Sequence, residues 1–490
     1  MIKFGSNYAQ KIQHLYSNKP FSFAIIGSGP AGLYTAKHLF NDIENINIHV
    51  FEQDLCPTGL IRYGMAPDHQ RIKRVAEELL TIKQYEQCHY FGGVTIGKDI
   101  TIDELDHMYS AVFYAFGAQC DKPLNIQGEQ LNNVYSARQI VNWYNSHPNY
   151  YDLDITFKNK NNIAIIGNGN VALDIARIFG LNQEELQKTD INEISIEKLK
   201  NNNITNIVII GRRGLVQSQF SLKELREMTK LTQFRFLLYK PDLIQSLNEE
   251  SQTECKDLGI NYGNVTRGNR RKLEFMRGFE IIEDEATMDA ILQEQNTNGK
   301  INVILRFLLT PIKIEQINDQ LHLKLQHNQL SGKAFNQMAI PIEEQSTIKC
   351  DMIIKSVGYQ SHNIDQHLPW NYEQNIIDNS DGCIKKDNSK LKVGSYACGW
   401  IKTGPKGVID STFGSSQETI VNFKNHMDAD LIKNIHDPYE EVVNLLKQRS
   451  INYIDFKVWD RINEFEIQQG LKVKKPRIKI TKNKEFLQFL

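Results

Sequence analysis

The residues with the clearest chemical pattern are the glycines of a short segment, GSGPAG, near the start of the chain. Gly27 permits a tight turn, Gly29 lets a phosphate approach the backbone, and Gly32 lets a helix pack closely against a strand. The helix beginning here would direct its N-terminus, which attracts anions, at a pyrophosphate. Glu52 ends the next apolar segment, about 20 residues further on, where a carboxylate can accept hydrogen bonds from a ribose. The pattern predicts a dinucleotide site; the alternative is a glycine-rich turn with a solvated Glu52.

A second segment, GNGNVA at residues 167–172, repeats the order of apolar run, glycine turn and helical pattern. The next apolar segment ends in Arg212 and Arg213 rather than in an acid, and the polar stretch 182–203 reads as an insertion before it. Guanidinium groups form charge-assisted, often bidentate hydrogen bonds with phosphate. The first turn therefore favours FAD, and the second favours NADP(H) with its 2′-phosphate. An exposed basic strand end is the alternative for the two arginines.

The bulk composition allows a hydrophobic core around both turns. The chain has 490 residues, of which 41% are hydrophobic and 23% are charged, as in globular proteins of two or three domains. A net charge of −1 gives no global indication of a nucleic-acid or membrane-surface partner, so we expect no nucleic acid. No apolar run approaches the length of a membrane span.

The cysteines argue against several kinds of site. Their odd count and wide spacing, without a CxxC pair, are unlike a disulfide framework, a cysteine-based zinc or cluster site, or a redox-active dithiol. We therefore expect a reducing compartment and predict no metal. The seven are Cys56, Cys88, Cys120, Cys255, Cys350, Cys383 and Cys398.

Apolar and helical segments alternate along the chain, which predicts an α/β fold with two Rossmann-like, glutathione-reductase-like domains. We expect an NADP-binding domain over 122–348, inserted into a discontinuous FAD-binding domain over 21–121 and 349–490. In this interpretation the apolar run at 352–354, which leads to Gly358, is the return to the first domain. Residues 1–20 are basic and free of acids, which is typical of an amphipathic mitochondrial presequence; an unstructured tail is the alternative.

Two further segments carry candidate functional side chains. Ser221 begins a helical pattern and Glu224 follows three residues later, as in a capping box, so Glu224 has a purely structural interpretation as well. A basic cluster on a near-neutral chain is a candidate docking site for an acidic partner, and a solvated charged face is the alternative. Its members are Arg267, Arg270, Arg271 and Lys272.

Several motifs occur in a fixed order over nearly the whole chain: GSGPAG, PTGLIRYGMAPDH, GNGNVALDIAR, GRRG followed by KELREM, and CGW followed by GPKGVI. Together they closely resemble the adrenodoxin reductase family, the mitochondrial NADPH:ferredoxin oxidoreductases and their bacterial relatives. The resemblance implies that NADPH gives a hydride to FAD and that the flavin passes single electrons to a [2Fe–2S] ferredoxin. It also implies a mitochondrial location on the matrix side, and leaves peripheral association with the inner membrane open.

The resemblance assigns roles to single residues. Those implied to contact FAD are Ala31, Glu52, Leu60, Ile96, Trp400, Gly407, Val408 and Ile409. Those implied to contact NADP(H) are Asn168, Gly169, Asn170, Val171, Arg212, Arg213 and Glu224, with Gly407 shared. His69, Asp174 and Glu224 would form a polar network near the nicotinamide that orients the ring or relays protons, and are the candidate catalytic residues. Asp410 and Ser415 depart from the family pattern beside the flavin.

The same residues bear on three other possible functions. A disulfide reductase needs the dithiol that the sequence lacks, and a module of a larger complex would usually carry a cysteine-rich cluster domain. A flavin-containing structural subunit of a respiratory or other assembly stays open because of Asp410 and Ser415. The Arg212–Arg213 pair argues against this third function, because it would serve no purpose without NADP.

Overall fold

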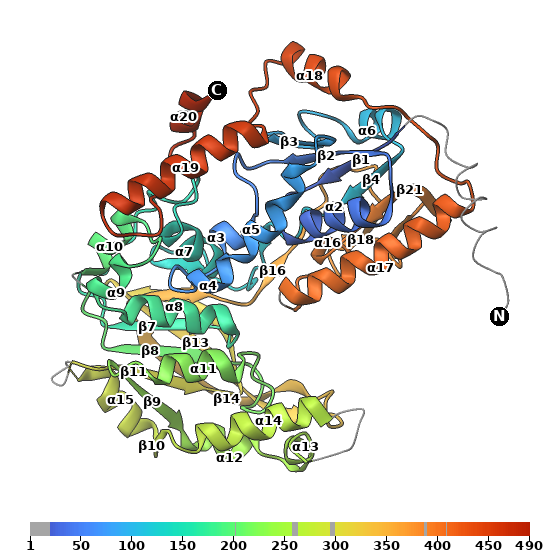
Figure 1. Cartoon of the computed structure of the whole chain (residues 1–490). Helices are drawn as coiled ribbons and strands as arrows, with labels where there is room; N and C mark the ends of the chain where they lie inside the picture. The colour runs from blue at the N-terminus through green and yellow to red at the C-terminus, as the bar shows by residue number, and fades with distance from the viewer. Residues whose placement is uncertain (1–19, 201, 257–262, 295–298, 387–389, 408) are drawn as a thin grey trace, which may run out of the picture.

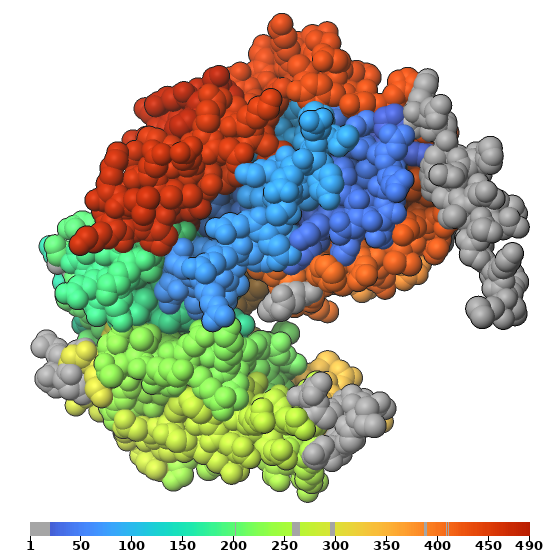
Figure 2. Space-filling model, in the orientation of Figure 1, coloured from blue at the N-terminus to red at the C-terminus, as the bar shows by residue number. Residues whose placement is uncertain are grey.

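The structure, a computed structural model, describes residues 20–200, 202–256, 263–294, 299–386, 390–407 and 409–490. Residues 1–19, which hold most of the predicted presequence, and Val408 lie outside the described residues. The described chain forms two lobes, each built around a seven-stranded sheet (Figure 1). Figure 2 shows that the lobes touch along one side and leave an open hollow between them on the other.

The first sheet takes its strands from both ends of the chain. Its order is β19 (Asn379–Ser380), β20 (Cys383–Lys385), β21 (Leu391–Ala397), β4 (Ala111–Tyr114), β1 (Phe21–Ile26), β2 (Ile46–Glu52) and β3 (Cys88–Gly92). Strands β21, β4, β1, β2 and β3 are parallel. Helices α2 (Pro30–Asp42) and α17 (Ile409–Asp428) cover one face. Helices α6 (Ile102–Met108) and α18 (Tyr439–Gln448) cover the other.

The second sheet is parallel throughout. Its order is β10 (Glu280–Ile282), β9 (Phe234–Tyr239), β11 (Ile301–Arg306), β8 (Asn206–Ile210), β7 (Asn162–Ile166), β15 (Met352–Lys355) and β6 (Val134–Ser136). Helices α7 (Ala137–Tyr144), α8 (Asn170–Gly180) and α11 (Leu222–Thr229) pack on one face. An antiparallel sheet of β12 (Leu309–Ile317), β13 (Gln320–Ser331) and β14 (Met338–Cys350) covers the other.

The interpretation of residues 352–354 as the return to the first domain is wrong. This run is β15, which pairs with β7 and β6 of the second sheet. The chain crosses back only afterwards, where β16 (Tyr359–Gln360) pairs with the outgoing β5 (Cys120–Asp121). A buried strand of a parallel sheet is apolar on both faces, so its sequence does not tell which sheet it joins.

The C-terminal segment ties the lobes together. On α19 (Phe456–Lys472), the buried Glu466 carboxylate accepts a hydrogen bond of 2.9 Å from Nη1 of Arg62 in the first lobe. Beyond α19, Nζ of the buried Lys479 lies 2.8 Å from the Asp190 carboxylate of the second lobe. These paired, buried charges fix how the two sheets face each other, because separating either pair would leave a buried charge without its partner.

The remaining elements are short or peripheral. They are α3 (Leu60–Tyr63), α4 (Gln70–Lys73), α5 (Val75–Leu79), η1 (Leu80–Gln84), α9 (Gln183–Gln187), α10 (Glu193–Lys200), α12 (Lys240–Ser246), α13 (Glu249–Thr253), α14 (Gly263–Met276), α15 (Glu285–Gln293), β17 (Trp370–Asn371), β18 (Ile376–Ile377), α16 (Trp400–Thr403), α20 (Asn483–Phe486) and η3 (Leu487–Phe489). None of the helices in the described ranges is long and apolar enough to cross a membrane.

Candidate functional site

The first glycine turn connects β1 to α2 and has the shape that a phosphate requires. Gly27 has a φ of 103°, and a Cβ on Gly32 would lie 1.9 Å from the carbonyl oxygen of Gly27, so both positions need glycine. Gly29 is different, because a Cβ there would meet no atom within 4 Å. It is also the N-cap of α2 and offers no side chain to the first N–H groups of the helix. The turn therefore leaves an open, anion-attracting space beside Gly29 and the buried Ala31.

Alanine at Gly29 is expected to keep the fold and to prevent FAD binding. The φ of Gly29 is −70°, which any residue adopts, and the added methyl group meets no protein atom. It would fill the place that a pyrophosphate needs. We expect purified Gly29→Ala protein to be colourless yet folded by circular dichroism. Gly169→Ala is the matched control, since it makes the same change in the second turn and should leave the protein yellow. A yellow Gly29→Ala protein would contradict the phosphate role.

Glu52 closes β2 beside this turn. Its Oε2 accepts hydrogen bonds of 2.8 Å from both the backbone N–H and the hydroxyl of Ser28, and its Oε1 accepts one of 3.1 Å from the Asp54 N–H. Burial raises the pKa of Glu52 to about 7, and the Asp54 charge adds to the rise. A ribose that donates hydrogen bonds to this carboxylate would favour its ionised form and bring the pKa down again.

The other residues expected to contact the flavin lie around the same edge of the first sheet. Leu60 begins α3, and the preceding Gly59 approaches Gly29 so closely that its Cβ would lie 3.2 Å from the Gly29 Cα. Trp400 begins α16, where its ring stacks on Tyr359 at 6.0 Å and its Nε1 donates to the Lys406 carbonyl at 3.1 Å. A Cβ on Gly399 would lie 2.4 Å from that of Ala31, which places this turn against the start of α2.

Three further expected contacts differ in their surroundings. Ile96 is buried in the core on the α6 side of the sheet, so its backbone rather than its side chain is available to a ligand. Gly407 has a φ of 84° and lies just before α17. Ile409 begins α17 and is half-buried against the α2 face, and Ser416 on the same helix donates a 3.2 Å hydrogen bond to the Ala31 carbonyl.

The second turn repeats this geometry between β7 and α8. Gly167 has a φ of 117°, and a Cβ on Gly169, the N-cap of α8, would meet no atom within 4 Å. The carbonyl of Asn168 accepts hydrogen bonds from the N–H groups of Gln219 and Phe220, and Oδ1 of Asn170 accepts one of 2.7 Å from the Ser221 N–H. Val171 follows on the first turn of α8 and is half-buried. The two asparagines thus hold residues 219–221, which lead into the helix that carries Glu224, against the second glycine turn.

Arg212 and Arg213 follow β8 on the same side of the second sheet. Arg212 is exposed and Arg213 half-buried, and neither guanidinium forms a hydrogen bond or ion pair with a residue in the described ranges. Burial lowers the pKa of Arg213, and the Arg212 charge lowers it further. The Glu254 charge acts on Arg213 in the opposite direction, without forming an ion pair with it. Two adjacent cations are suited to a dianionic phosphate, which would relieve their mutual repulsion.

The three candidate catalytic residues meet between the lobes. His69 comes from the loop before α4, Asp174 from α8 and Glu224 from α11, and their ligating atoms all lie within 4.8 Å of one another. Nε2 of His69 is 3.6 Å from Oε2 of Glu224. Ser221 caps α11 as expected, but its N–H is bonded to Asn170, so the Glu224 carboxylate does not complete a capping box.

The centre of this cluster is Arg177, a residue that the sequence did not single out. It donates to Asp68 at 2.6 and 3.0 Å, to Asp174 at 2.8 Å and to Nε2 of His69 at 3.0 Å. Because a guanidinium only donates, this Nε2 is the acceptor and carries no proton. Asp174 and Arg177 share the GNGNVALDIAR motif, and Asp68 precedes His69 in APDH, so the signal was present in both motifs.

Burial controls the charge of the cluster. It raises the pKa of Glu224, with the Asp174 charge as the second cause, and it raises the pKa of Asp174 although Arg177 acts in the opposite direction. Burial alone would lower the pKa of Arg177, but its hydrogen bonds to Asp68 and the charge of Asp174 raise it. Oε2 of Glu224 and Nη1 of Arg177 are buried without a hydrogen bond. Such atoms are available to a polar group of a bound ligand.

The predicted basic cluster lies on α14, at the far end of the second lobe (Figure 1). Arg267, Arg270 and Arg271 are exposed, and Arg270 lies 3.9 Å from Glu274. Including Lys272 in this surface was wrong: its side chain is buried, and its Nζ donates to the Ser218 carbonyl at 2.6 Å. Burial lowers the pKa of Lys272 to about 8.

Known proteins are similar to this chain over nearly its whole length. NADPH:adrenodoxin oxidoreductase, mitochondrial, of Arabidopsis thaliana is 31% identical over 476 residues, which cover 95% of this chain and 94% of the relative. The protein of the same name from Mus musculus is 32% identical, with coverages of 95% and 91%. The chain belongs to the NADPH:adrenodoxin oxidoreductase family. The family model of the pyridine nucleotide-disulphide oxidoreductases also matches residues 21–228.

A solved structure agrees with this assignment. Mycobacterium tuberculosis FprA in complex with NADPH superimposes with a TM-score of 0.82 at 29% identity, covering 96% of this chain and 99% of that one. The prediction of an α/β fold with two Rossmann-like units and that of the family are therefore confirmed. At Ser415, one of the two departures from the family pattern, the side-chain hydroxyl is buried without a hydrogen bond to a described residue.

Proposed function

We propose that this chain is an FAD-containing oxidoreductase that takes a hydride from NADPH and passes single electrons to a [2Fe–2S] ferredoxin, on the matrix side of mitochondria. The observation that carries this proposal is the pair of open glycine turns, one in each lobe. Arg212 and Arg213, which form no ion pair with a described residue, lie beside the second turn. Family members named for NADPH and adrenodoxin, and for mitochondria, support the same function. A structural subunit that does not use NADPH is not favoured.

The residues of the first lobe fit FAD. The N-terminus of α2 and the space at Gly29 accept the pyrophosphate, and Glu52 accepts hydrogen bonds from the adenosine ribose. Trp400 and the glycine-containing turn that ends at Gly407 would lie beside the isoalloxazine ring of a bound FAD. Bound FAD supplies a hydride acceptor that can release electrons one at a time, which no side chain provides.

The residues of the second lobe hold and orient NADPH. Gly169 and the N-terminus of α8 accept its pyrophosphate, and Arg212 and Arg213 bind its 2′-phosphate. His69 and Glu224 lie where the lobes meet, and Oε2 of Glu224 forms no hydrogen bond to a described residue. Glu224 would accept a hydrogen bond from the nicotinamide carboxamide. Arg177, through its hydrogen bonds to Asp68, His69 and Asp174, would hold the two lobes in place around the ring. In this role His69, Asp174 and Glu224 orient the nicotinamide ring.

The assay that tests this proposal is NADPH-dependent reduction of a [2Fe–2S] ferredoxin by the purified yellow protein. We expect turnover with NADPH and far slower turnover with NADH, because only NADPH carries the 2′-phosphate for the arginines. A yellow protein that NADPH does not reduce would favour the structural-subunit alternative instead.

We propose that the ferredoxin docks on the exposed arginines of α14. This helix lies along the lower edge of the second lobe in Figure 1, and its three arginines are exposed. An acidic ferredoxin would complement this positive surface, and complementary charges mainly raise the association rate. Peripheral attachment to the inner membrane and cleavage of a presequence within residues 1–20 stay predictions.

Charge reversal at Arg270 and Arg271 is expected to weaken ferredoxin reduction and to spare NADPH-to-dye activity. Both side chains are exposed, so the change acts on the encounter with the partner and not on folding. We expect kcat/KM for ferredoxin to fall about tenfold or more at low salt and less at high salt. The Lys188→Glu/Lys198→Glu variant makes the same change in net charge on α9–α10, away from α14, and is the control. Equal losses in both variants would remove α14 from the interface.

A further inference from the structure

A group of metal-ligating side chains lies on the first lobe, outside the dinucleotide sites. His49 of β2 and His89 of β3 are opposite each other in the parallel ladder and share a face of the sheet. Asp437, two residues before α18, reaches over them from the C-terminal part of the chain. One ligand atom from each of the three lies within 4.8 Å of the others. The cysteine spacing, which disfavours a cysteine-based site, does not bear on a site of this kind.

The innermost ligand is arranged as in known metal sites. His49 has no exposed surface, and its Nε2 lies 3.1 Å from Oδ1 of Asp437. Two ligands each about 2.0–2.1 Å from a tetrahedral zinc ion lie about 3.3 Å apart, so this separation fits a shared ion. The other ring nitrogen, Nδ1, lies 2.6 Å from the hydroxyl of Tyr109. Such a contact to the second nitrogen fixes the orientation of a ligating imidazole.

His89 is available as the remaining ligand of this group. His89 is half-buried, and no residue in the described ranges hydrogen-bonds to its ring nitrogens, although the ring packs on Tyr439 at 4.3 Å. Asp437 lies close to both histidines, with one carboxylate oxygen within 4.8 Å of a ring nitrogen of each. Asp437 is exposed, so water can reach the fourth position.

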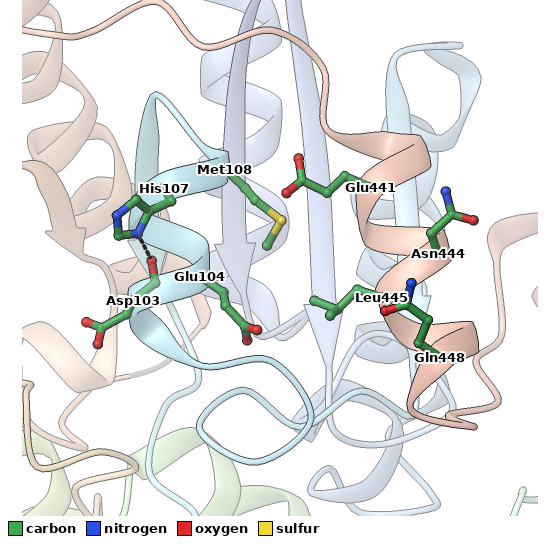
Figure 3. Close-up of a pocket in the computed structure, with 8 residues that line it drawn as sticks. All are labelled: Asp103, Glu104, His107, Met108, Glu441, Asn444, Leu445 and Gln448. Carbon is green, nitrogen blue, oxygen red and sulfur yellow. Dashed lines mark hydrogen bonds between the residues drawn. The ribbon is translucent and has the colours of Figure 1, made fainter.

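The surface next to the group is also acidic. A groove runs between α6 and α18, the helices whose ends carry Tyr109 and Asp437 (Figure 3). The carboxylates of Asp103, Glu104 and Glu441 line it; of these, Glu104 is paired with Arg449. A groove lined by one sign of charge concentrates ions of the opposite sign.

We propose that His49, His89 and Asp437 bind one divalent transition-metal ion of the zinc class, with water as the fourth ligand. Two imidazoles and one carboxylate with an open position suit Zn²⁺, Co²⁺ or Ni²⁺ and disfavour Mg²⁺ or Ca²⁺, which take oxygen ligands. The ion joins β2 and the edge strand β3 to the segment just before α18, nearly 350 residues after His89 in the sequence, and thereby holds the C-terminal part of the chain on the first sheet.

The test is a titration of the FAD-loaded protein, freed of metal by a chelator, with Zn²⁺ and with Co²⁺ by calorimetry. We expect one tight ion per chain and a higher Tm in its presence. His89→Gln and Asp437→Asn should each raise Kd at least tenfold, and Tyr109→Phe should raise it about 10–100-fold. His107→Gln, an exposed histidine on the neighbouring α6, is the control and should bind as the unchanged protein does.

Two results would overturn the site. One is a wild-type protein that binds no ion, and the other is a His89→Gln/Asp437→Asn variant that binds one ion with unchanged Kd, because the ion would then lie elsewhere. Flavin content and circular dichroism show whether the variants fold. X-ray absorption of the unchanged protein with Zn²⁺ gives a test without mutation: we expect a four-coordinate nitrogen and oxygen shell at about 2.0–2.1 Å. A six-coordinate oxygen shell would contradict the site.

Discussion

Replacing both Arg212 and Arg213 with alanine is expected to weaken NADPH binding about 100-fold or more, because each charge-assisted hydrogen bond to phosphate is worth about 1.5–3 kcal/mol. Arg213 should account for the larger share. It is half-buried, whereas Arg212 is exposed and its contact is screened by solvent. The measurement is the KM for NADPH in dye reduction, with the two single variants alongside the double one.

NADH provides the control within the same experiment. It lacks the 2′-phosphate, so the KM for NADH should change little in any of the three variants. A parallel loss for both coenzymes would mean that the arginines support the fold of the turn rather than select the phosphate.

The second large effect is expected for Arg177→Met. The substitution keeps much of the side-chain volume but removes the cation that Asp68 and Asp174 share, and removing one partner of a buried ion pair costs about 3–5 kcal/mol. We expect the free energy of unfolding in urea to fall by about this amount. Flavin reduction by NADPH should slow about 100-fold, because His69 and Glu224 lose the group that fixes their positions.

Arg138→Met is the matched control for this variant. Arg138 also pairs with an aspartate, Asp121 at 3.1 Å, but both side chains are about one quarter exposed. Partly exposed pairs contribute about 0–1 kcal/mol, so stability and flavin reduction should change little. If Arg177→Met behaves as Arg138→Met does, the cluster around Arg177 neither holds the lobes together nor positions the reacting groups.

The sequence predicted the parts of the site that depend on local geometry. The turns at Gly29 and Gly169 could be recognised because strand, glycines and helix follow one another directly, and the arginines because they occupy the end of the next strand. Glu52 followed from the spacing after the first turn, whereas Glu224 followed only from the resemblance to the family motifs.

What the sequence did not reveal depends on contacts between distant segments. Arg177 reads as an ordinary helical arginine until Asp68 and His69, from the loop before α4, and Glu224, from α11, are brought to it. Lys272 lies four residues before the buried Met276, so the helical period turns it inward while its basic neighbours stay outside. The sheet membership of β15 rests on hydrogen bonds to β6 and β7, which an apolar run does not encode.

The most direct test of the proposed function is an anaerobic titration of the yellow protein with NADPH, followed by addition of oxidised [2Fe–2S] ferredoxin. We predict that one equivalent of NADPH bleaches the flavin absorbance, that NADH does so far more slowly, and that two equivalents of ferredoxin restore the absorbance as single electrons leave. Bleaching by NADPH without recovery on adding ferredoxin, or equal rates with NADH and NADPH, would contradict it.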